Sequence, residues 1–100
     1  MTRSELAGQL WTGVLTVTFI KKDGTQRTIT GTQDPTRIPF YKHPKTLATE
    51  GSPVITNRPA CSIFDLTLEE WRSFSWDSVH LITSFDGQVQ YDVARDGGIQ

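Results

Sequence analysis

The sequence predicts a single, mostly β domain: a small barrel of five or six short antiparallel strands with a short N-terminal α-helix. Apolar and polar residues alternate along residues 14–21, which is the pattern of a strand with one buried face. Turn sequences at Lys22–Gly24 and Asp86–Gly87 separate segments rich in β-branched and aromatic residues. Three aromatic residues cluster within Trp71–Trp76, and such a cluster marks either a core seam or a stacking surface.

Residues 1–13 are predicted to form the N-terminal helix. Thr2 can cap it, and Glu5 stands three positions later as the second member of a capping box. Leu6 and Leu10 share one helical face, which predicts that the helix docks against the barrel.

The first hairpin has two candidate registers. A two-residue Asp-Gly turn sets Ile29 opposite Thr18, on the face away from Val17. A three-residue Lys22–Gly24 loop, with Gly24 in the left-handed conformation, sets Ile29 opposite Val17. The second register collects the apolar side chains on one face, so it is the one predicted.

A long insertion is predicted over residues 32–59. This segment holds all five prolines, and proline cannot donate a hydrogen bond to a strand ladder. It also carries more apolar residues than a free linker usually does. Val54–Thr56 could form a brief edge strand within it.

Later strands complete a barrel over residues 14–93. They are predicted at residues 61–66, 71–75, 80–85 and 88–93. A single helical turn is expected at 76–79, with Ser75 as its cap. Residues 94–100, which include two adjacent glycines, are predicted to form a frayed tail.

The composition excludes several classes of protein. No apolar run is longer than two residues, whereas a membrane-spanning helix needs about 20. Arg3 and Glu5 stand where a signal peptide needs an unbroken apolar segment. Cys61 is the only cysteine, so an intrachain disulfide is excluded and a reducing compartment fits. The sequence therefore predicts a cytoplasmic protein with no membrane partner.

Charge is distributed unevenly along the chain, although the formal net charge is only −1. Residues 21–58 carry seven basic and three acidic side chains, and residues 59–100 carry two basic and seven acidic ones. This asymmetry is compatible with a basic face for an anionic partner. It is equally compatible with an ordinary solvated surface on which the charges separate by chance.

Two blocks of sequence occur in a recognisable order. The first comprises Phe19–Thr25 with Arg27, then Thr30–Thr32 with Asp34–Pro35 and Ile38–Pro39, and the second comprises Phe64–Leu66 with Trp71–Val79. Together they resemble a family of small bacteriophage-encoded proteins described as WYL-like, with an Sm-like or SH3-like β-barrel. The resemblance implies that fold, a phage origin and a place in the host cytoplasm. The Trp-Tyr-Leu triplet of the larger WYL ligand-sensing domains is absent here, so neither a ligand-binding nor a transcription-factor role is carried over.

Catalytic chemistry has little support in the sequence. Cys61 and His80 are the best candidates for a thiol–imidazole pair, but a lone cysteine in a strand is usually inert packing. Cys61, His43 and His80 lack metal-ligand spacing, and there is no glycine-rich phosphate loop. We therefore expect no enzyme activity, no catalytic residue, no metal and no cofactor.

Binding of RNA or DNA is the leading functional hypothesis, because small barrels of this class commonly present basic and aromatic surfaces. The predicted contacts are Lys21, Lys22, Arg27, Lys42, Lys45, Arg58 and Arg72, with Phe40, Tyr41 and Trp76 as stacking platforms. Core packing is the alternative for Trp71, Phe74 and Trp76. A surface ion pair with Asp65 is the alternative for Arg72.

A protein-interaction module is the rival hypothesis. Ile38, Phe40 and Tyr41 in the Pro-rich insertion could form an apolar patch for a host protein. Exposed barrel edges could also pair with a second copy of the chain, giving a homo-oligomer.

Overall fold

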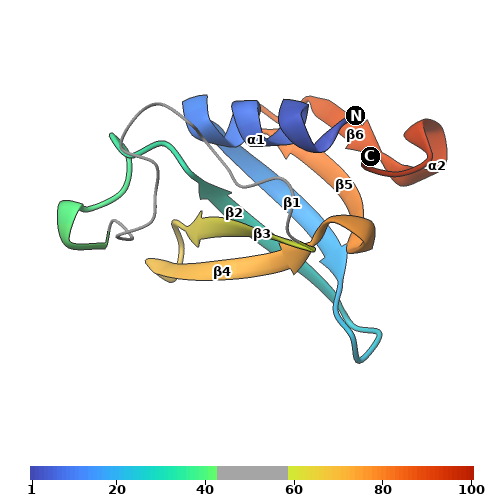
Figure 1. Cartoon of the computed structure of the whole chain (residues 1–100), viewed down its shortest axis with the longest axis horizontal. Helices are drawn as coiled ribbons and strands as arrows, with labels where there is room; N and C mark the ends of the chain where they lie inside the picture. Colours follow the sequence, from blue (N-terminus) through green and yellow to red (C-terminus); the bar gives the residue numbers. More distant parts are fainter. Residues whose placement is uncertain (43–58) are drawn as a thin grey trace.

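The computed structural model describes residues 1–42 and 59–100, which form a mostly β molecule with one six-stranded antiparallel sheet (Figure 1). In chain order the elements are α1 (Arg3–Thr12), β1 (Val14–Ile20), β2 (Gln26–Thr32), η1 (Phe40–Lys42), β3 (Ala60–Asp65), β4 (Glu70–Ser75), η2 (Trp76–Ser78), β5 (Val79–Ser84), β6 (Val89–Asp92) and α2 (Val93–Asp96). The strand order in the sheet is β4-β3-β2-β1-β5-β6. The predicted fold class is confirmed.

The N-terminal helix is held by the predicted capping residues. The Thr2 hydroxyl accepts a hydrogen bond from the Glu5 backbone N–H at 3.1 Å and donates to Glu5 Oε1 at 3.3 Å. Leu6 and Leu10 are fully buried, and α1 lies against β1 and β2 (Figure 1). Docking of these side chains stabilises a helix that would be marginal alone, because a helix of this length rarely forms in isolation.

The β1–β2 hairpin adopts the predicted three-residue loop. The Lys21 N–H donates to the Thr25 carbonyl at 2.8 Å, and the Gly24 N–H donates to the Lys21 carbonyl at 2.9 Å. Gly24 has a φ of 88°, which a residue with a side chain rarely adopts. Val17 lies opposite Ile29, and both side chains are buried. The register chosen from the apolar pattern is confirmed.

Strands β2 and β3 are paired at one end only. Gly31 lies opposite Asp65 and Thr32 opposite Phe64, whereas β1 follows β2 over its whole length. Strands β2 and β3 therefore separate beyond Gly31, and the β1–β2 hairpin runs past the β3–β4 hairpin (Figure 1). This separation leaves room for a cleft between the two hairpins.

One hydrophobic core lies between α1 and the sheet. Phe74 and Trp76 both belong to it, and their rings meet edge to face with centroids 6.3 Å apart. Outside this cluster, Phe64 packs against the half-buried Trp71, with centroids 5.6 Å apart. Core packing is therefore confirmed for Phe74 and Trp76, whereas Trp71 packs against Phe64 outside the core cluster.

The link from β4 to β5 is the single helical turn that the sequence predicts, now seen as η2. Ser75 occupies the predicted N-cap position, but its side chain makes no capping hydrogen bond. Instead the Ser78 hydroxyl donates to the Ser75 carbonyl at 2.7 Å. The turn is closed from its C-terminal side.

The prediction that residues 94–100 fray is also wrong. Gly97 has a φ of 77° and caps α2, and Ile99 is buried in the core. The Arg3 N–H donates to the Gln100 carbonyl at 2.9 Å, so the two ends of the chain are joined. The glycines that suggested fraying form a helix C-cap and a short connection to a buried residue. Local composition cannot reveal docking onto the distant N-terminus.

The predicted insertion at residues 32–59 is described through residue 42. The Gln33 N–H donates to the Leu10 carbonyl at 2.8 Å, which joins the start of the insertion to α1. Ile38 is buried, so it anchors this segment. The predicted edge strand at Val54–Thr56 lies outside the described residues.

Candidate nucleic-acid interface

A cleft with a volume of about 570 Å³ lies between the end of the β1–β2 hairpin and β4. Four basic side chains line it: Lys21, Lys22, Arg27 and Arg72. The first three were predicted from one stretch of sequence, and the fourth comes from a strand more than forty residues further along the chain. The fold therefore brings together four of the seven basic residues predicted to bind nucleic acid.

Strand alternation explains why the two arginines point into the cleft. Arg27 lies opposite Phe19 in the β1–β2 register and shares a strand face with buried Ile29. Arg72 shares a strand face with buried Phe74. Each arginine therefore continues a row of core side chains beyond the edge of the core. Its aliphatic stem can pack on apolar neighbours while the guanidinium stays near water.

Two phenylalanines that contact each other belong to the apolar part of the cleft lining, together with Ile20, Ile29 and Ala60. The rings of Phe19 and Phe74 lie with their centroids 5.7 Å apart and an interplanar angle of 31°. Both side chains are buried, so they support the cleft from below and do not offer open ring faces. The cleft thus combines a rigid apolar base with cationic walls.

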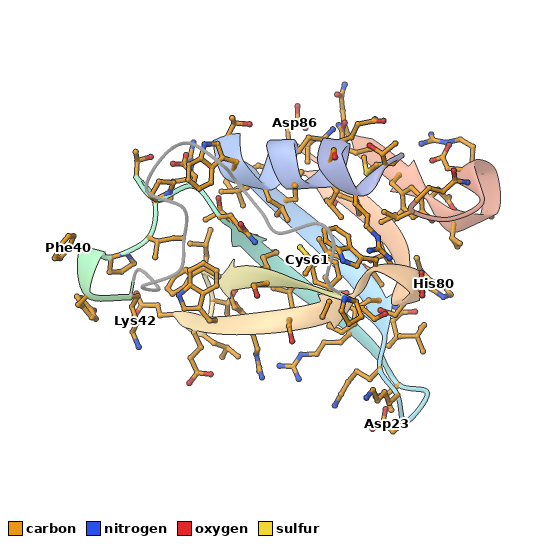
Figure 2. All side chains as sticks on the ribbon, in the orientation of Figure 1. Asp23, Phe40, Lys42, Cys61, His80 and Asp86 are labelled. Atoms are coloured by element: carbon orange, nitrogen blue, oxygen red, sulfur yellow. The ribbon has the colours of Figure 1, made fainter. Side chains whose placement is uncertain are left out.

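The residues that line the cleft carry more positive than negative charge, with four basic side chains and one carboxylate. Asp23 is the one carboxylate among the lining residues, and it lies at the tip of the hairpin (Figure 2). Its carboxylate accepts hydrogen bonds from the Thr25 hydroxyl at 2.6 Å and from the Thr25 N–H at 3.0 Å. These bonds hold the pKa of Asp23 below its ordinary value. The ion pairs formed within residues 1–42 and 59–100 join Arg37 to Asp34 and Arg95 to Asp96, outside this cleft.

Arg72 does not form the ion pair with Asp65 that was the alternative for it. Asp65 lies opposite Glu70 in the β3–β4 register, while Arg72 lies opposite Ile63. The Asp65 carboxylate accepts hydrogen bonds from the backbone N–H groups that follow it, those of Thr67 and Leu68, at 2.8 and 3.1 Å. The acid closes its own turn, so that alternative is wrong.

Trp76 is not available as a stacking platform, so this prediction is wrong. Only 1% of the residue is exposed, because η2 turns it into the core. The Arg3 guanidinium covers it, with the guanidinium carbon 5.4 Å from the ring centroid. The sequence pattern places an aromatic residue here but cannot show which way the turn directs it.

Lys42 does not line the cleft with the four cations, and its predicted contact with nucleic acid stays a prediction. Lys42 and Phe40 lie at the opposite end of the molecule from Asp23 (Figure 2). The Lys42 carbonyl accepts a hydrogen bond from the Trp71 indole at 2.6 Å, and its ammonium lies 6.0 Å from the Tyr41 ring centroid. The remaining predicted contacts, Lys45 and Arg58, lie outside the described residues.

The predicted apolar patch is only partly formed. Phe40 is 88% exposed and Tyr41 is 79% exposed, as a protein-interaction patch requires. Ile38 is 4% exposed and faces the interior, so its inclusion in the patch is wrong. Phe40 and Tyr41 both belong to η1, in which no residue is buried, whereas Ile38 precedes this turn.

Three serines that were not predicted as contacts also border the cleft. They are Ser73, Ser75 and Ser78. Ser73 and Ser75 alternate with Arg72 and Phe74 along β4, so their side chains point to the face of the strand opposite that of the arginine. The position of these residues beside the β1–β2 hairpin could not be predicted from the sequence, because it depends on how two distant segments pack.

The thiol–imidazole pair is not formed. Cys61 is fully buried on β3 and His80 is exposed on β5, and β2 and β1 lie between these strands in the sheet (Figure 2). Burial raises the pKa of the Cys61 thiol to about 12, so the thiol stays protonated and unreactive at neutral pH.

We expect native Cys61 to resist an aromatic disulfide reagent at neutral pH, because the reagent attacks an accessible thiolate. The same protein unfolded in urea should react fully. Absorbance of the released thiolate measures both reactions. Rapid labelling of the native protein would show that β3 opens readily or that the thiol is accessible.

Residues 1–42 and 59–100 lack two further features. No group of three or more metal-ligating side chains is present in this part of the chain. Among the same residues, none of the helices has the length and apolar character that crossing a membrane requires.

Comparison with known proteins identifies a family. A family model described as WYL_2, Sm-like SH3 beta-barrel fold, matches residues 3–79. The matched range includes α1, β1 to β4 and η2, and with them all four cations of the cleft. No curated protein and no solved structure matches the chain significantly.

Proposed function

Because this chain belongs to the WYL_2 family of Sm-like SH3 β-barrels, we propose that it is a non-enzymatic module that binds nucleic acid through the cleft between β4 and the β1–β2 hairpin. WYL domains are generally associated with nucleic-acid binding and regulation. The proposal includes a bacteriophage origin and an accessory role in the host cytoplasm, as the resemblance of the two sequence blocks suggests.

The observation that carries the proposal is the convergence of four cations on one cleft. Lys21, Lys22, Arg27 and Arg72 line a space with a single carboxylate, that of Asp23, so the lining keeps an excess of positive charge. An excess of cations in a concave site concentrates the field and attracts anions. Nucleic acid fits such a site because its backbone supplies one negative charge at every nucleotide.

Binding is expected to weaken steeply as salt is added. If each of the four cations neutralises one phosphate of a single strand, the slope of log affinity against log salt is about −2.8. Fluorescence anisotropy of a labelled oligonucleotide over a series of salt concentrations measures this slope. The double variant Lys21→Gln/Lys22→Gln should reduce the slope by about half, because it removes two of the four contacts.

The control for this experiment is Lys42→Gln. Lys42 is the same type of residue, but it lies at the far end of the molecule from the hairpin tip (Figure 2). Its replacement should leave both the affinity and the slope unchanged. If neither RNA nor DNA is retarded by the protein in a gel at low salt, the proposal is wrong. If Lys42→Gln weakens binding more than Lys21→Gln/Lys22→Gln does, the binding site is not the cleft.

A second candidate function is binding of a host protein through Phe40 and Tyr41. The high exposure of both rings favours it, since large aromatic side chains are enriched at the centres of protein interfaces. A pull-down from host lysate, with and without nuclease, separates the two functions. Nuclease-resistant recovery of one host protein that is lost in Phe40→Ser/Tyr41→Ser would favour protein binding. Recovery of nucleic acid alone would count against it.

A further inference from the structure

The four cations of the cleft lie at two depths. Lys21 and Lys22 are exposed on the hairpin, whereas Arg27 and Arg72 are half-buried in the walls. An exposed lysine can meet any polyanion that approaches the surface. A recessed arginine can be reached only by an anion that enters the cleft.

The two recessed arginines come from different hairpins and share the same space. Arg27 stands on β2 and Arg72 on β4, and neither forms an ion pair with a carboxylate of the described residues. Two guanidinium groups in one cleft repel each other unless an anion lies between them. A phosphodiester suits this position, because its two non-bridging oxygens match the paired donors of a guanidinium group.

Arg72 shows a specific deficit that an anion would relieve. Its Nε is buried from water and has no hydrogen-bond partner among the described residues. A buried donor without an acceptor is costly, and structures rarely tolerate one. A guanidinium that turns toward a phosphate in the cleft gains an acceptor for this group.

We infer that Arg27 and Arg72 together hold one phosphodiester of a single-stranded nucleic acid, and that the cleft discriminates against duplex. This inference rests on the proposed function. A duplex is a stiff rod, so its phosphates meet protruding side chains and cannot enter a recess between two hairpins. The cleft has the size of a site for one small ligand, which corresponds to a short piece of a flexible strand. A single strand can bend its backbone into such a space.

The test compares a single strand and a duplex of the same sequence and length, by anisotropy at low salt with the full chain. We expect the wild-type protein to bind the single strand at least about tenfold more tightly than the duplex. Arg27→Met/Arg72→Met keeps the apolar stems and removes both charges. This variant should lose about tenfold or more in single-strand affinity and change duplex affinity much less. Lys21→Gln/Lys22→Gln should weaken the binding of both.

A charge-conserving variant distinguishes a phosphate site that depends on the donor geometry of the guanidinium groups from one that depends on positive charge alone. Arg27→Lys/Arg72→Lys keeps both positive charges but loses the planar pair of donors, so single-strand affinity should fall several-fold. Unchanged thermal unfolding of each variant shows that the fold is intact. Full affinity in the lysine variant would overturn the phosphate site formed by the arginines.

The outcomes distinguish this inference from the proposed function. Equal affinity for single strand and duplex would overturn the preference for a single strand and leave nucleic-acid binding in place. No binding of either at low salt would overturn the proposed function itself.

Discussion

Replacing Trp76 with alanine is expected to lower the free energy of unfolding by about 3–5 kcal/mol. Trp76 is among the largest fully buried side chains, and its ring packs on Phe74 at a centroid distance of 6.3 Å. Its removal leaves a cavity that the surrounding strands and η2 cannot fill, because they are constrained by their own pairing. Urea denaturation followed by circular dichroism measures the loss as a shift of the midpoint.

Phe85→Ala is the matched control for this variant. Phe85 is also a large aromatic residue, but it is 82% exposed at the β5–β6 turn. Its replacement should change the free energy of unfolding by less than about 0.5 kcal/mol. If the Trp76→Ala protein is as stable as the wild type and loses only nucleic-acid binding, Trp76 is not a core residue. The stacking role predicted from the sequence would then be correct.

Replacing Gly31 with alanine is expected to destabilise the protein by about 2–3 kcal/mol or to prevent folding. A Cβ at this position would lie 2.4 Å from the Phe64 carbonyl oxygen and 2.7 Å from Ile63 Cγ1. Such distances are closer than atoms can approach, and one of the two neighbours is backbone. Gly31 is one of the two β2 residues that pair with β3, so the strain falls on the junction of the two hairpins.

Gly8→Ala is expected to have the opposite effect on stability from Gly31→Ala. Gly8 lies within α1, and a Cβ there meets nothing within 4 Å. Alanine should stabilise the protein by about 0.5–1 kcal/mol, because glycine is a poor helix former. Thermal unfolding of the two variants should therefore shift in opposite directions. A Gly31→Ala protein as stable as the wild type would show that β2 and β3 are not held at this close approach.

The local pattern of the sequence was sufficient for much of the fold. The alternation that includes Val17 and the Lys22–Gly24 loop predicted the first hairpin and its register, because strand pairing across a tight turn depends on residues close in sequence. Thr2 and Glu5 predicted the start of α1 for the same reason. The errors at Trp76 and at residues 94–100 concern contacts with distant parts of the chain.

The sequence by itself determined the fold class, the hairpin register and the identity of the basic residues, since these depend on short-range periodicity and composition. Only the tertiary structure decided which cations share a site: Arg72 and Arg27 line the same cleft, and Lys42 lies at the far end of the molecule. The physical reason is the separation of β2 from β3 beyond Gly31. This separation depends on packing between segments that are distant in the sequence, so a local sequence pattern cannot predict it.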